Sequence, residues 1–409
     1  MSRSKTVRTV KGGVTSPKGF RAAGVPAAIK YENRNDVALI VADEPCDAAA
    51  VFTTNKVAAA PVVYDREIIK GGRIQAILAN SGCANACTGE EGMKDAKLSA
   101  LVTAGELGID PKHVLVASTG VIGRRLPMDR LLAGMKRAKA ALGRTRNHGL
   151  MAEKAVMTTD TVPKEACARV TIDGRTVTVG GMSKGSGMIE PNMATMLGFI
   201  TTDADITSSG LKRALTLAIN KSFNRVVVDG DESTNDSVFL LASGKAGNKR
   251  IIGSGEDFRL FTEALTAVCV SLARQMAKDG EGATKFVTVT VRGARNDRDA
   301  ERAARAVAKS PLAKTSWFGK DPNWGRVLAA VGYSGADVED MKTEVFYDRA
   351  WAFKCGKVAD ADQLKVLGKV LEKDEFEVVV DLHLGKGEAS IYTCDFSLDY
   401  VHINADYTT

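Results

Sequence analysis

Short apolar runs bounded by turn residues recur along the first half of the chain, and they restrict the fold more than any other feature. Each run is shorter than a typical helix and rich in Val, Ile and Ala, which is typical of β-strands. This pattern predicts strands over residues 37–43, 49–54, 74–80 and 113–120. Residues 168–180 read as two further strands joined by Asp173-Gly174, a pair that favours a tight hairpin turn. A sheet of several strands is therefore expected.

Helical periodicity alternates with these strands and becomes more frequent in the second half. Residues 129–142, for example, place Leu131, Met135, Ala138 and Leu142 on one face, and a glycine follows. Similar spacing predicts further helices over 211–222, 256–278 and 297–309, and alternation predicts strands over 285–291 and 375–384. The sequence thus predicts an α/β (α+β) chain with boundaries near 205 and 285.

The composition favours a soluble globular protein over a nucleic-acid or membrane protein. The chain has 409 residues, of which 44% are hydrophobic and 26% charged, and its basic excess of +7 is scattered rather than clustered. No run approaches the roughly 18 apolar residues that span a bilayer, and the basic first ten residues lack the apolar region of a secretory signal. Seven cysteines, an odd number, favour reduced thiols and a cytoplasmic location. Neither nucleic acid nor a membrane is expected as a partner.

Common catalytic motifs do not occur. The chain has no phosphate-binding P-loop, no dinucleotide-binding glycine motif and no G-x-S-x-G nucleophile elbow. Its four histidines lack the spacing of zinc hydrolases, and Cys83 and Cys87 have no second pair that would complete a zinc site. The acidic run 229–236, D-G-D-E-S-T-N-D, lacks the spacing of an EF-hand. We expect no metal and no cofactor.

One threonine suggests a different chemistry. The glycine-rich run G-G-M-S-K-G-S-G-M leads directly into I-E-P-N-M-A-T, which ends at Thr195. If the bond between Ala194 and Thr195 were cut, the new α-amine would lie next to its own hydroxyl. Such an amine has a pKa of roughly 7.7–8.0, so it could take the hydroxyl proton near neutral pH without a histidine. Residue chemistry alone leaves a plain turn as the alternative.

Long motifs in both halves resemble the ornithine acetyltransferase family, also called the bifunctional glutamate N-acetyltransferase / amino-acid N-acetyltransferase family. The resemblance covers nearly the whole chain. In the first half it rests on G-G-V-T-S-P-K-G-F-R-A-A-G, L-A-N-S-G-C-A-N-A-C-T-G, A-S-T-G-V-I-G and I-E-P-N-M-A-T-M-L-G-F-I-T-T-D. In the second half it rests on F-N-R-V-V-V-D-G-D-E-S-T-N-D-S, D-P-N-W-G-R and I-N-A-D-Y-T-T. Cys83 departs from the asparagine expected in many members.

The resemblance implies a fold and a set of site residues. The fold would be a self-cleaving αββα-type sandwich over 1–204, carrying the oxyanion hole and the cleavage site. A small α/β domain over 205–285 and a C-terminal α/β domain over 286–409 would follow, the latter with its tail at the active site. Cleavage after Ala194 would make Thr195 the nucleophile, and Thr119 and Gly120 would form the oxyanion hole. Substrate contacts would come from Thr158, Lys184, Thr195, Glu281, Asn404 and Thr409.

The activity implied is acetyl transfer in arginine biosynthesis. N2-acetyl-L-ornithine would acetylate Thr195, and L-glutamate would then accept the acetyl group. Some members also use acetyl-CoA, and no feature of this sequence decides that. The two cleaved chains would assemble as an α2β2 heterotetramer. No metal or cofactor would be needed, so the acidic run 229–236 would be a polar loop near the site. Two alternatives stay open: an aminopeptidase or amidase of the same self-cleaving fold, and a basic binding protein with a glycine-rich loop.

Overall fold

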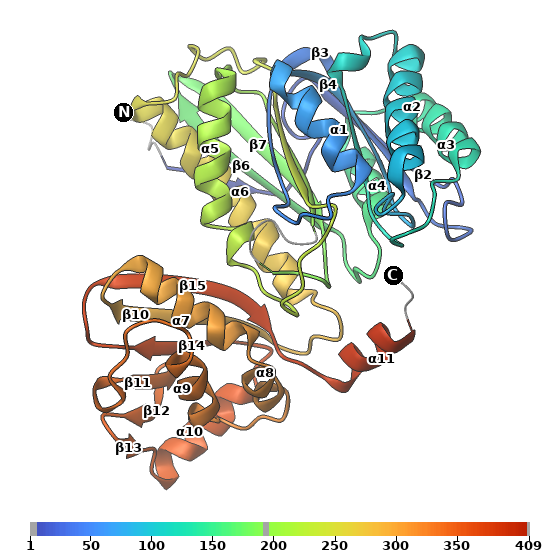
Figure 1. The fold of residues 1–409 in the computed structure, drawn as a ribbon. Helices are drawn as coiled ribbons and strands as arrows, with labels where there is room; N and C mark the ends of the chain where they lie inside the picture. The colour runs from blue at the N-terminus through green and yellow to red at the C-terminus, as the bar shows by residue number, and fades with distance from the viewer. Residues whose placement is uncertain (1–5, 191–195, 407–409) are drawn as a thin grey trace.

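The computed structural model describes residues 6–190 and 196–406, which form two β-sheets with helices packed on them (Figure 1). Every helix in these residues is too short or too polar to cross a bilayer. The first sheet has nine strands, and β2 (Phe20–Val25) pairs with β3 beside its main path. That path runs in the order β1 (Arg8–Val10), β6 (Lys164–Ile172), β7 (Arg175–Lys184), β8 (Leu197–Thr202), β9 (Ser237–Ala242), β3 (Val37–Phe52), β4 (Arg73–Asn80) and β5 (Val114–Ser118).

Strand β3 belongs to both halves of this sheet. Its first part pairs with β2 and its last part with β9, and its register with β4 shifts between Val41 and Cys46. Such an irregularity bends a strand, so the sheet divides into a β2–β5 half and a β6–β9 half. One hydrophobic cluster combines residues of both halves, such as Ile40 with Phe199 and Phe239. The inner faces of the two halves therefore pack against each other.

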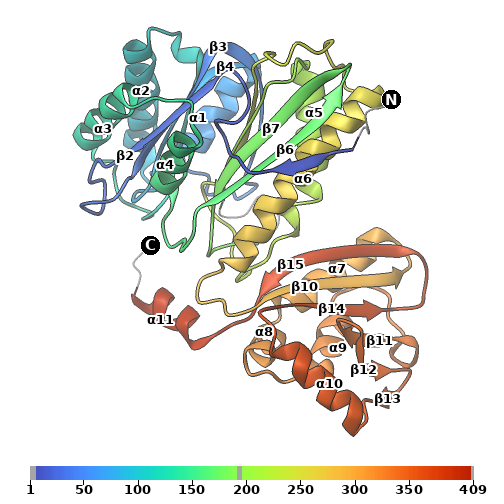
Figure 2. The same cartoon turned by 180° about the vertical axis from the view of Figure 1, so that it is seen from behind.

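Helices cover the outer faces of the two halves. On the β6–β9 half lie α5 (Ser208–Asn220) and α6 (Gly255–Lys278). On the other half lie α2 (Gly89–Leu107) and α3 (Met128–Ala140), with α1 (Ala60–Ile68) beside β5. Between the halves, α4 (Arg146–Val156) packs on β2 and β3. Figures 1 and 2 show these layers from opposite sides. The expected helix–sheet–sheet–helix sandwich is confirmed.

The second sheet contains six strands from residues 344–394 and 286–294. Its apolar face packs against α7 (Asp297–Lys309), α8 (Pro311–Phe318) and α9 (Trp324–Gly332), and α10 (Ala361–Leu371) packs on β12. Trp317 and Tyr347 are fully buried in this core. The strand order is β13 (Lys357–Val358), β12 (Ala350–Lys354), β11 (Glu344–Tyr347), β14 (Glu375–Asp381), β10 (Phe286–Ala294) and β15 (Gly387–Cys394).

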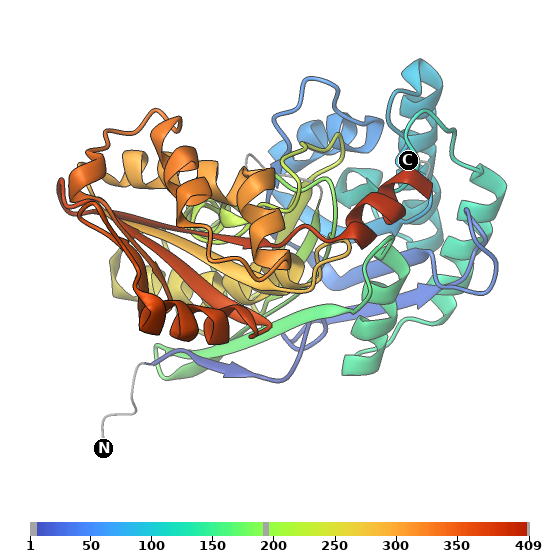
Figure 3. The ribbon, with the colours of Figure 1, turned by 90° about the horizontal axis from the view of Figure 1, so that it is seen from below.

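The chain returns to the first unit at its end. After β15, helix α11 (Leu398–Asp406) leaves the second sheet and lies beside the first unit, as Figure 3 shows. The ring of Phe396 stacks on that of Tyr400 with centroids 4.6 Å apart, and Ser397 donates a hydrogen bond to the carbonyl of Gly282 over 2.6 Å. These contacts hold α11 against the loop that follows α6.

Residues 205–285 contribute to the first unit. Their strand β9 lies between β8 and β3, and their helices α5 and α6 pack on the first sheet. Within the described residues, four one-turn 3₁₀ segments complete the secondary structure: Ile69–Gly71, Pro111–His113, Phe223–Arg225 and Asp340–Lys342. The division of the chain into three domains at 204 and 285 stays a prediction, and the strand pairing groups the first two parts together.

Two glycine substitutions, one at the contact between α4 and β2 and one on the exposed face of α2, should have opposite effects on stability. A Cβ atom on Gly24 of β2 would lie 1.9 Å from the carbonyl oxygen of Met151, so Gly24→Ala must displace α4. Overpacking of this kind costs about 1–3 kcal/mol or more. Gly105 of α2 is exposed with no atom within 4 Å of such a Cβ, and Gly105→Ala should stabilise the protein by about 0.5–1 kcal/mol. Urea unfolding of both variants checks the signs; equal effects would contradict this packing.

Candidate active site

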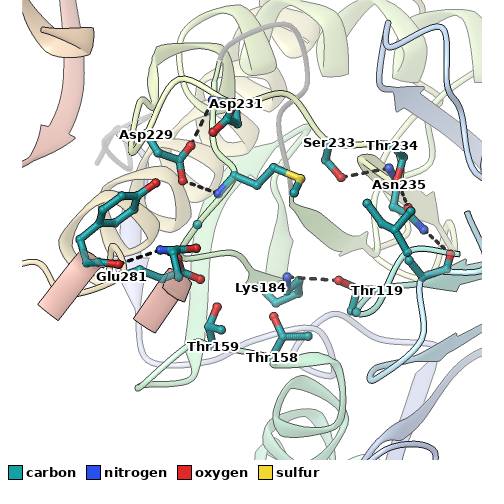
Figure 4. Close-up of a pocket in the computed structure, with 17 residues that line it drawn as sticks. Thr119, Thr158, Thr159, Lys184, Asp229, Asp231, Ser233, Thr234, Asn235 and Glu281 are labelled. Carbon is teal, nitrogen blue, oxygen red and sulfur yellow. Dashed lines mark hydrogen bonds between the residues drawn. The ribbon is translucent and has the colours of Figure 1, made fainter. Parts of the chain in front are cut away.

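A cavity of about 130 Å³ lies where β5 and β7 end, and α11 contributes part of its wall. Figure 4 shows the residues that line it. Six residues expected at the site line this cavity together: Thr119, Gly120, Thr158, Lys184, Glu281 and Asn404. The remaining three, Ala194, Thr195 and Thr409, lie outside the described residues. The structure therefore brings together residues that are far apart in the sequence, and their individual roles stay predictions.

The turn after β5 carries Thr119 and Gly120. The Thr119 N–H donates to the carbonyl of Asn80 over 3.0 Å, and Thr119 also forms a bridge with Cys83. Gly120 has a φ of 128°, and a Cβ there would lie 2.4 Å from the backbone of Gly82. Only glycine fits this position. The turn is thus held tightly with the Thr119 hydroxyl facing the cavity.

Lys184 supplies a cation at this side of the cavity. It is the last residue of β7, is only 3% exposed, and its Nζ donates to Oγ1 of Thr119 over 3.3 Å. Burial lowers the pKa of this ammonium group, although the carboxylates of Asp160, Asp236 and Glu281 act in the opposite direction. In Figure 4 Lys184 points toward Thr119. A buried ammonium with a single weak partner among the described residues is well suited to bind an anionic group.

A buried ionic cluster behind the cavity connects three of the segments that line it. Oδ1 of Asp160 accepts from Nζ of Lys164 and from the Gly185 N–H, each over 2.7 Å, and Oδ2 accepts from the Thr158 N–H over 3.0 Å. Lys164 also donates to Oδ2 of Asp279 over 2.5 Å. Burial alone would raise the pKa of Asp160, but the ammonium groups of Lys164 and Lys184 lower it to about 2. The segments of Thr158, Lys184 and Glu281 are thereby fixed relative to one another.

The opposite side of the cavity is acidic. Glu281 accepts a hydrogen bond at Oε2 from the side-chain amide of Asn404 over 2.9 Å, which connects α11 to the cavity. Asp229 and Asp231 lie nearby, and burial raises the pKa of Asp229 to about 6. Burial, assisted by these three carboxylates, also raises the pKa of Tyr400, so its phenol stays protonated. The cavity therefore offers a cation at one end and carboxylates at the other (Figure 4).

This arrangement suits a small molecule that carries both charges. A carboxylate would lie near Lys184 and an ammonium group near Glu281, while the hydroxyl groups between them would bind neutral polar atoms. Within residues 6–190 and 196–406, no group of three or more His, Cys, Asp or Glu side chains could hold a metal ion. The groups that line the cavity are hydroxyls, backbone amides and fixed charges.

Two groups of residues at the site were not singled out individually from the sequence. The first is the acidic run 229–236, which was expected to be a polar loop near the site without roles for its members. It contributes Asp229, Asp231 and residues 233–235 to the cavity wall. The second is the ionic cluster, whose members Lys164 and Asp279 are 115 positions apart. A hint was present in M-T-T-D-T, because it places Asp160 two residues after Thr158. Lys164 follows four positions after Asp160, but no local spacing connects this pair with Asp279.

Comparisons with known proteins identify a matching family and several relatives. The ArgJ family matches residues 21–409. The arginine biosynthesis bifunctional protein ArgJ of Symbiobacterium thermophilum is 51% identical over 97% of this chain and 99% of its own length. The glutamate N-acetyltransferase of Methanocaldococcus jannaschii is 46% identical over 98% and 100%, respectively. A crystal structure of ornithine acetyltransferase from Mycobacterium tuberculosis, complexed with ornithine, is 43% identical, with 46% of this chain and 98% of that chain covered and a TM-score of 0.43.

A buried carboxyl beside the ionic cluster predicts a loss of stability at high pH. Glu153 of α4 is fully buried, and its Oε1 accepts from the Lys164 N–H over 2.8 Å. Burial raises its pKa from 4.5 to about 9. Between these values the unfolded chain has released this proton while the folded chain retains it, so unfolding becomes easier as pH rises through the window.

Glu153→Gln should remove this dependence. Relative to the wild-type protein, the free energy of unfolding of the variant should rise by at least about 1.4 kcal/mol from pH 5 to pH 9, the equivalent of one pKa unit. Urea unfolding at the two pH values measures it, and exposed Glu388→Gln is the control. A constant difference between variant and wild type at both pH values would contradict the protonated state of Glu153.

Proposed function

We propose that this chain, which belongs to the ArgJ family, moves an acetyl group from N2-acetyl-L-ornithine to L-glutamate through an acetyl ester on Thr195. The chain is an acyltransferase of arginine biosynthesis. The observation that supports the finer proposal is the cavity itself, where Thr119, Gly120 and Lys184 face Glu281. Its two ends carry the charges complementary to acetylornithine, which has one carboxylate and one side-chain ammonium.

Self-cleavage would prepare the nucleophile. The hydroxyl of Thr195 attacks the carbonyl carbon of Ala194, the peptide C–N bond breaks, and the nitrogen takes up the hydroxyl proton to become an amine. Water then hydrolyses the resulting ester, which frees the carboxylate of Ala194 and restores the Thr195 hydroxyl. The new α-amine is partly neutral near pH 8 and can act as a general base for its own hydroxyl. No histidine is required.

Acetyl transfer would follow in two steps. The Thr195 oxygen adds to the acetyl carbonyl of acetylornithine, and the α-amine passes the hydroxyl proton to the departing ornithine nitrogen. The amine of glutamate then attacks the acetyl ester, and the proton that it loses returns to the Thr195 oxygen. Negative charge develops on the carbonyl oxygen in each step. We assign its stabilisation to the hydroxyl of Thr119 and the backbone N–H of Gly120, an oxyanion hole of the usual composition.

The same cavity has to accept two different side chains. We assign the α-carboxylate of either substrate to Lys184. Thr158 and the tail residues Asn404 and Thr409 are further substrate contacts. The ammonium of ornithine pairs with Glu281. Glutamate brings a carboxylate to the same end, where the protonated Tyr400 hydroxyl and the Asn404 amide are hydrogen-bond donors. The acetyl donor, acetylornithine, and the acetyl acceptor, glutamate, would thus use different groups at the acidic end.

The proposed assembly is an α2β2 heterotetramer of the 194-residue and 215-residue pieces, which follows from the family resemblance. We also place the protein in the cytoplasm. All seven cysteines lie in the described residues and each carries a free thiol, as is usual for that compartment.

Thr195→Ala should leave the chain whole and inactive. Denaturing electrophoresis should show a single 43.4 kDa chain for the variant and two pieces of similar size for the wild type. Release of ornithine from acetylornithine should require glutamate in the wild type and be absent in the variant. Thr216→Ala on the exposed face of α5 is the matched control and should behave as the wild type. Full turnover with the junction intact would overturn the mechanism, and release without glutamate would make the protein an amidase.

Glu281→Gln should separate the two half-reactions. The neutral amide keeps an oxygen for the Asn404 contact but removes the charge that faces the ornithine ammonium. KM for acetylornithine should rise by about 10–100-fold, the size of a lost charge-assisted hydrogen bond, while KM for glutamate stays the same or falls. Steady-state rates with each substrate varied in turn measure this, with exposed Glu263→Gln as the control. An equal rise for both substrates would place Glu281 elsewhere in the mechanism.

A further inference from the structure

The run D-G-D-E-S-T-N-D forms a loop over Asp229–Asp236, directly before β9, and we call it the acidic loop. The mechanism above uses none of its side chains. Asp229, Asn235 and Asp236 make hydrogen bonds to backbone groups of other segments. These contacts lie before and after the proposed cleavage junction between Ala194 and Thr195, and beside the turn of Thr119 and Gly120, which we call the oxyanion turn.

The first end of the acidic loop holds the chain before the cleavage junction. Asp229 accepts from the Met188 N–H at Oδ2 over 2.5 Å and from the Ile189 N–H at Oδ1 over 2.9 Å. The Val228 N–H donates in return to the carbonyl of Ile189 over 2.9 Å. Both oxygens of one carboxylate are therefore used on two successive amides that stand five and six positions before Ala194.

The other end of the acidic loop holds the chain after the junction. Oδ1 of Asp236 accepts from the N–H of Met196 over 2.8 Å, and Met196 follows Thr195 directly. The Ser237 N–H donates to the Met196 carbonyl over 3.2 Å, where β8 and β9 begin to pair. Asp236 is 1% exposed, so water does not compete for this contact.

Asn235 connects the same loop to the oxyanion turn. Its side-chain amide donates to the carbonyl of Ala84 over 2.6 Å and to that of Ser118 over 2.8 Å. Ser118 is the last residue of β5 and directly precedes Thr119 and Gly120. The Thr234 hydroxyl donates to Oδ1 of Asn235 over 2.5 Å, which fixes the orientation of the amide.

We propose that the acidic loop is the template for self-cleavage, in which Asp229 and Asp236 fix the chain on either side of the junction and Asn235 fixes the oxyanion turn against it. This inference rests on the proposed self-cleavage. An attack on a neighbouring carbonyl needs the reacting atoms within about 3–3.5 Å, and restricting both flanks removes most competing conformations. Side-chain oxygens suit this role because they accept hydrogen bonds from backbone amides: the two oxygens of Asp229 hold two amides, and Oδ1 of Asp236 holds one. Asp229, Asn235 and Asp236 are positioning residues, since they act through the backbone.

Isosteric exchanges of oxygen and nitrogen provide the test. Asp236 uses one oxygen, so Asp236→Asn keeps its contact and should slow cleavage by less than about 10-fold. Asp236→Ala loses the contact with the Met196 amide. Asp229→Asn loses one of its two contacts with the Met188 and Ile189 amides. Asn235→Asp places a carboxylate against two carbonyl oxygens, those of Ala84 and Ser118. Each of these three should slow cleavage by about 100-fold, comparable to the loss of one oxyanion-hole donor.

A matched control lies at the opposite end of β8. Asp203 is also buried, and its oxygens accept from the backbone N–H groups of Thr178 over 2.7 Å and Lys18 over 3.3 Å, away from the junction. Asp203→Asn should lower the melting temperature as Asp229→Asn does, yet cleave at the wild-type rate. Each full-length chain is made in a brief cell-free synthesis, the two products are timed by denaturing electrophoresis, and the rates are corrected for the folded fraction.

The possible outcomes separate this inference from the function on which it rests. Wild-type-like cleavage by folded Asp229→Asn and Asn235→Asp would overturn the template. So would slowing by Asp203→Asn equal to that of Asp229→Asn, because general destabilisation would then explain both. A wild-type chain that never cleaves would instead refute the proposed function. The expected order, with Asp203→Asn fastest, Asp236→Asn next and the other three slowest, would support the template.

Discussion

The buried contact between Asp160 and Lys164 is the interaction on which the site depends most. Both side chains are fully buried, so each would be a costly isolated charge without the other. Removal of one partner of such a pair typically costs about 3–5 kcal/mol. The same carboxylate also binds the amides beside Thr158 and Lys184, and Lys164 reaches Asp279, two residues before Glu281. Three segments that are separated in the sequence are thus held together by one charge cluster. Loss of that cluster would change the geometry of the cavity.

The cluster also explains how Lys184 can stay inside the cavity. Buried ammonium groups tend to lose their proton, and the negative charge of Asp160 opposes this at Lys184. On the other side, Asp229, Asp231 and Glu281 maintain a negative potential. Charge separation across one small cavity is a simple means of orienting an amino acid, because both ends of the substrate are recognised at once. Backbone amides and hydroxyl groups then need to act only on the atoms that react.

Local sequence patterns predicted fewer than half of the described strands and helices, and they did not predict how these join. The helices expected over 129–142 and 256–278 correspond to α3 and α6, and the hairpin turn at Asp173-Gly174 is present. The strands expected over 37–43 and 49–54 are one strand, β3, because the turn-like residues between them sit in its bulged middle. The place of β9 beside β3 depends on pairing across some 190 residues, which no local pattern encodes. Lys184 and Glu281 can be predicted through family resemblance, whereas the cluster behind them depends on contacts that the fold creates.

The order of strands in the first sheet has a consequence for the life of a cleaved enzyme. A break between residues 194 and 195 assigns β7 to one piece and β8 to the other, and β8 and β9 then lie between β7 and β3 of the first piece. Strands of the two pieces alternate within one sheet, so neither piece can dissociate without breaking the hydrogen bonds between them. Folding takes place while the strands belong to one molecule, but refolding after the break would require two molecules to meet. Such a protein would be kinetically stable: its native state would persist because unfolding is slow, and it would not readily refold once unfolded.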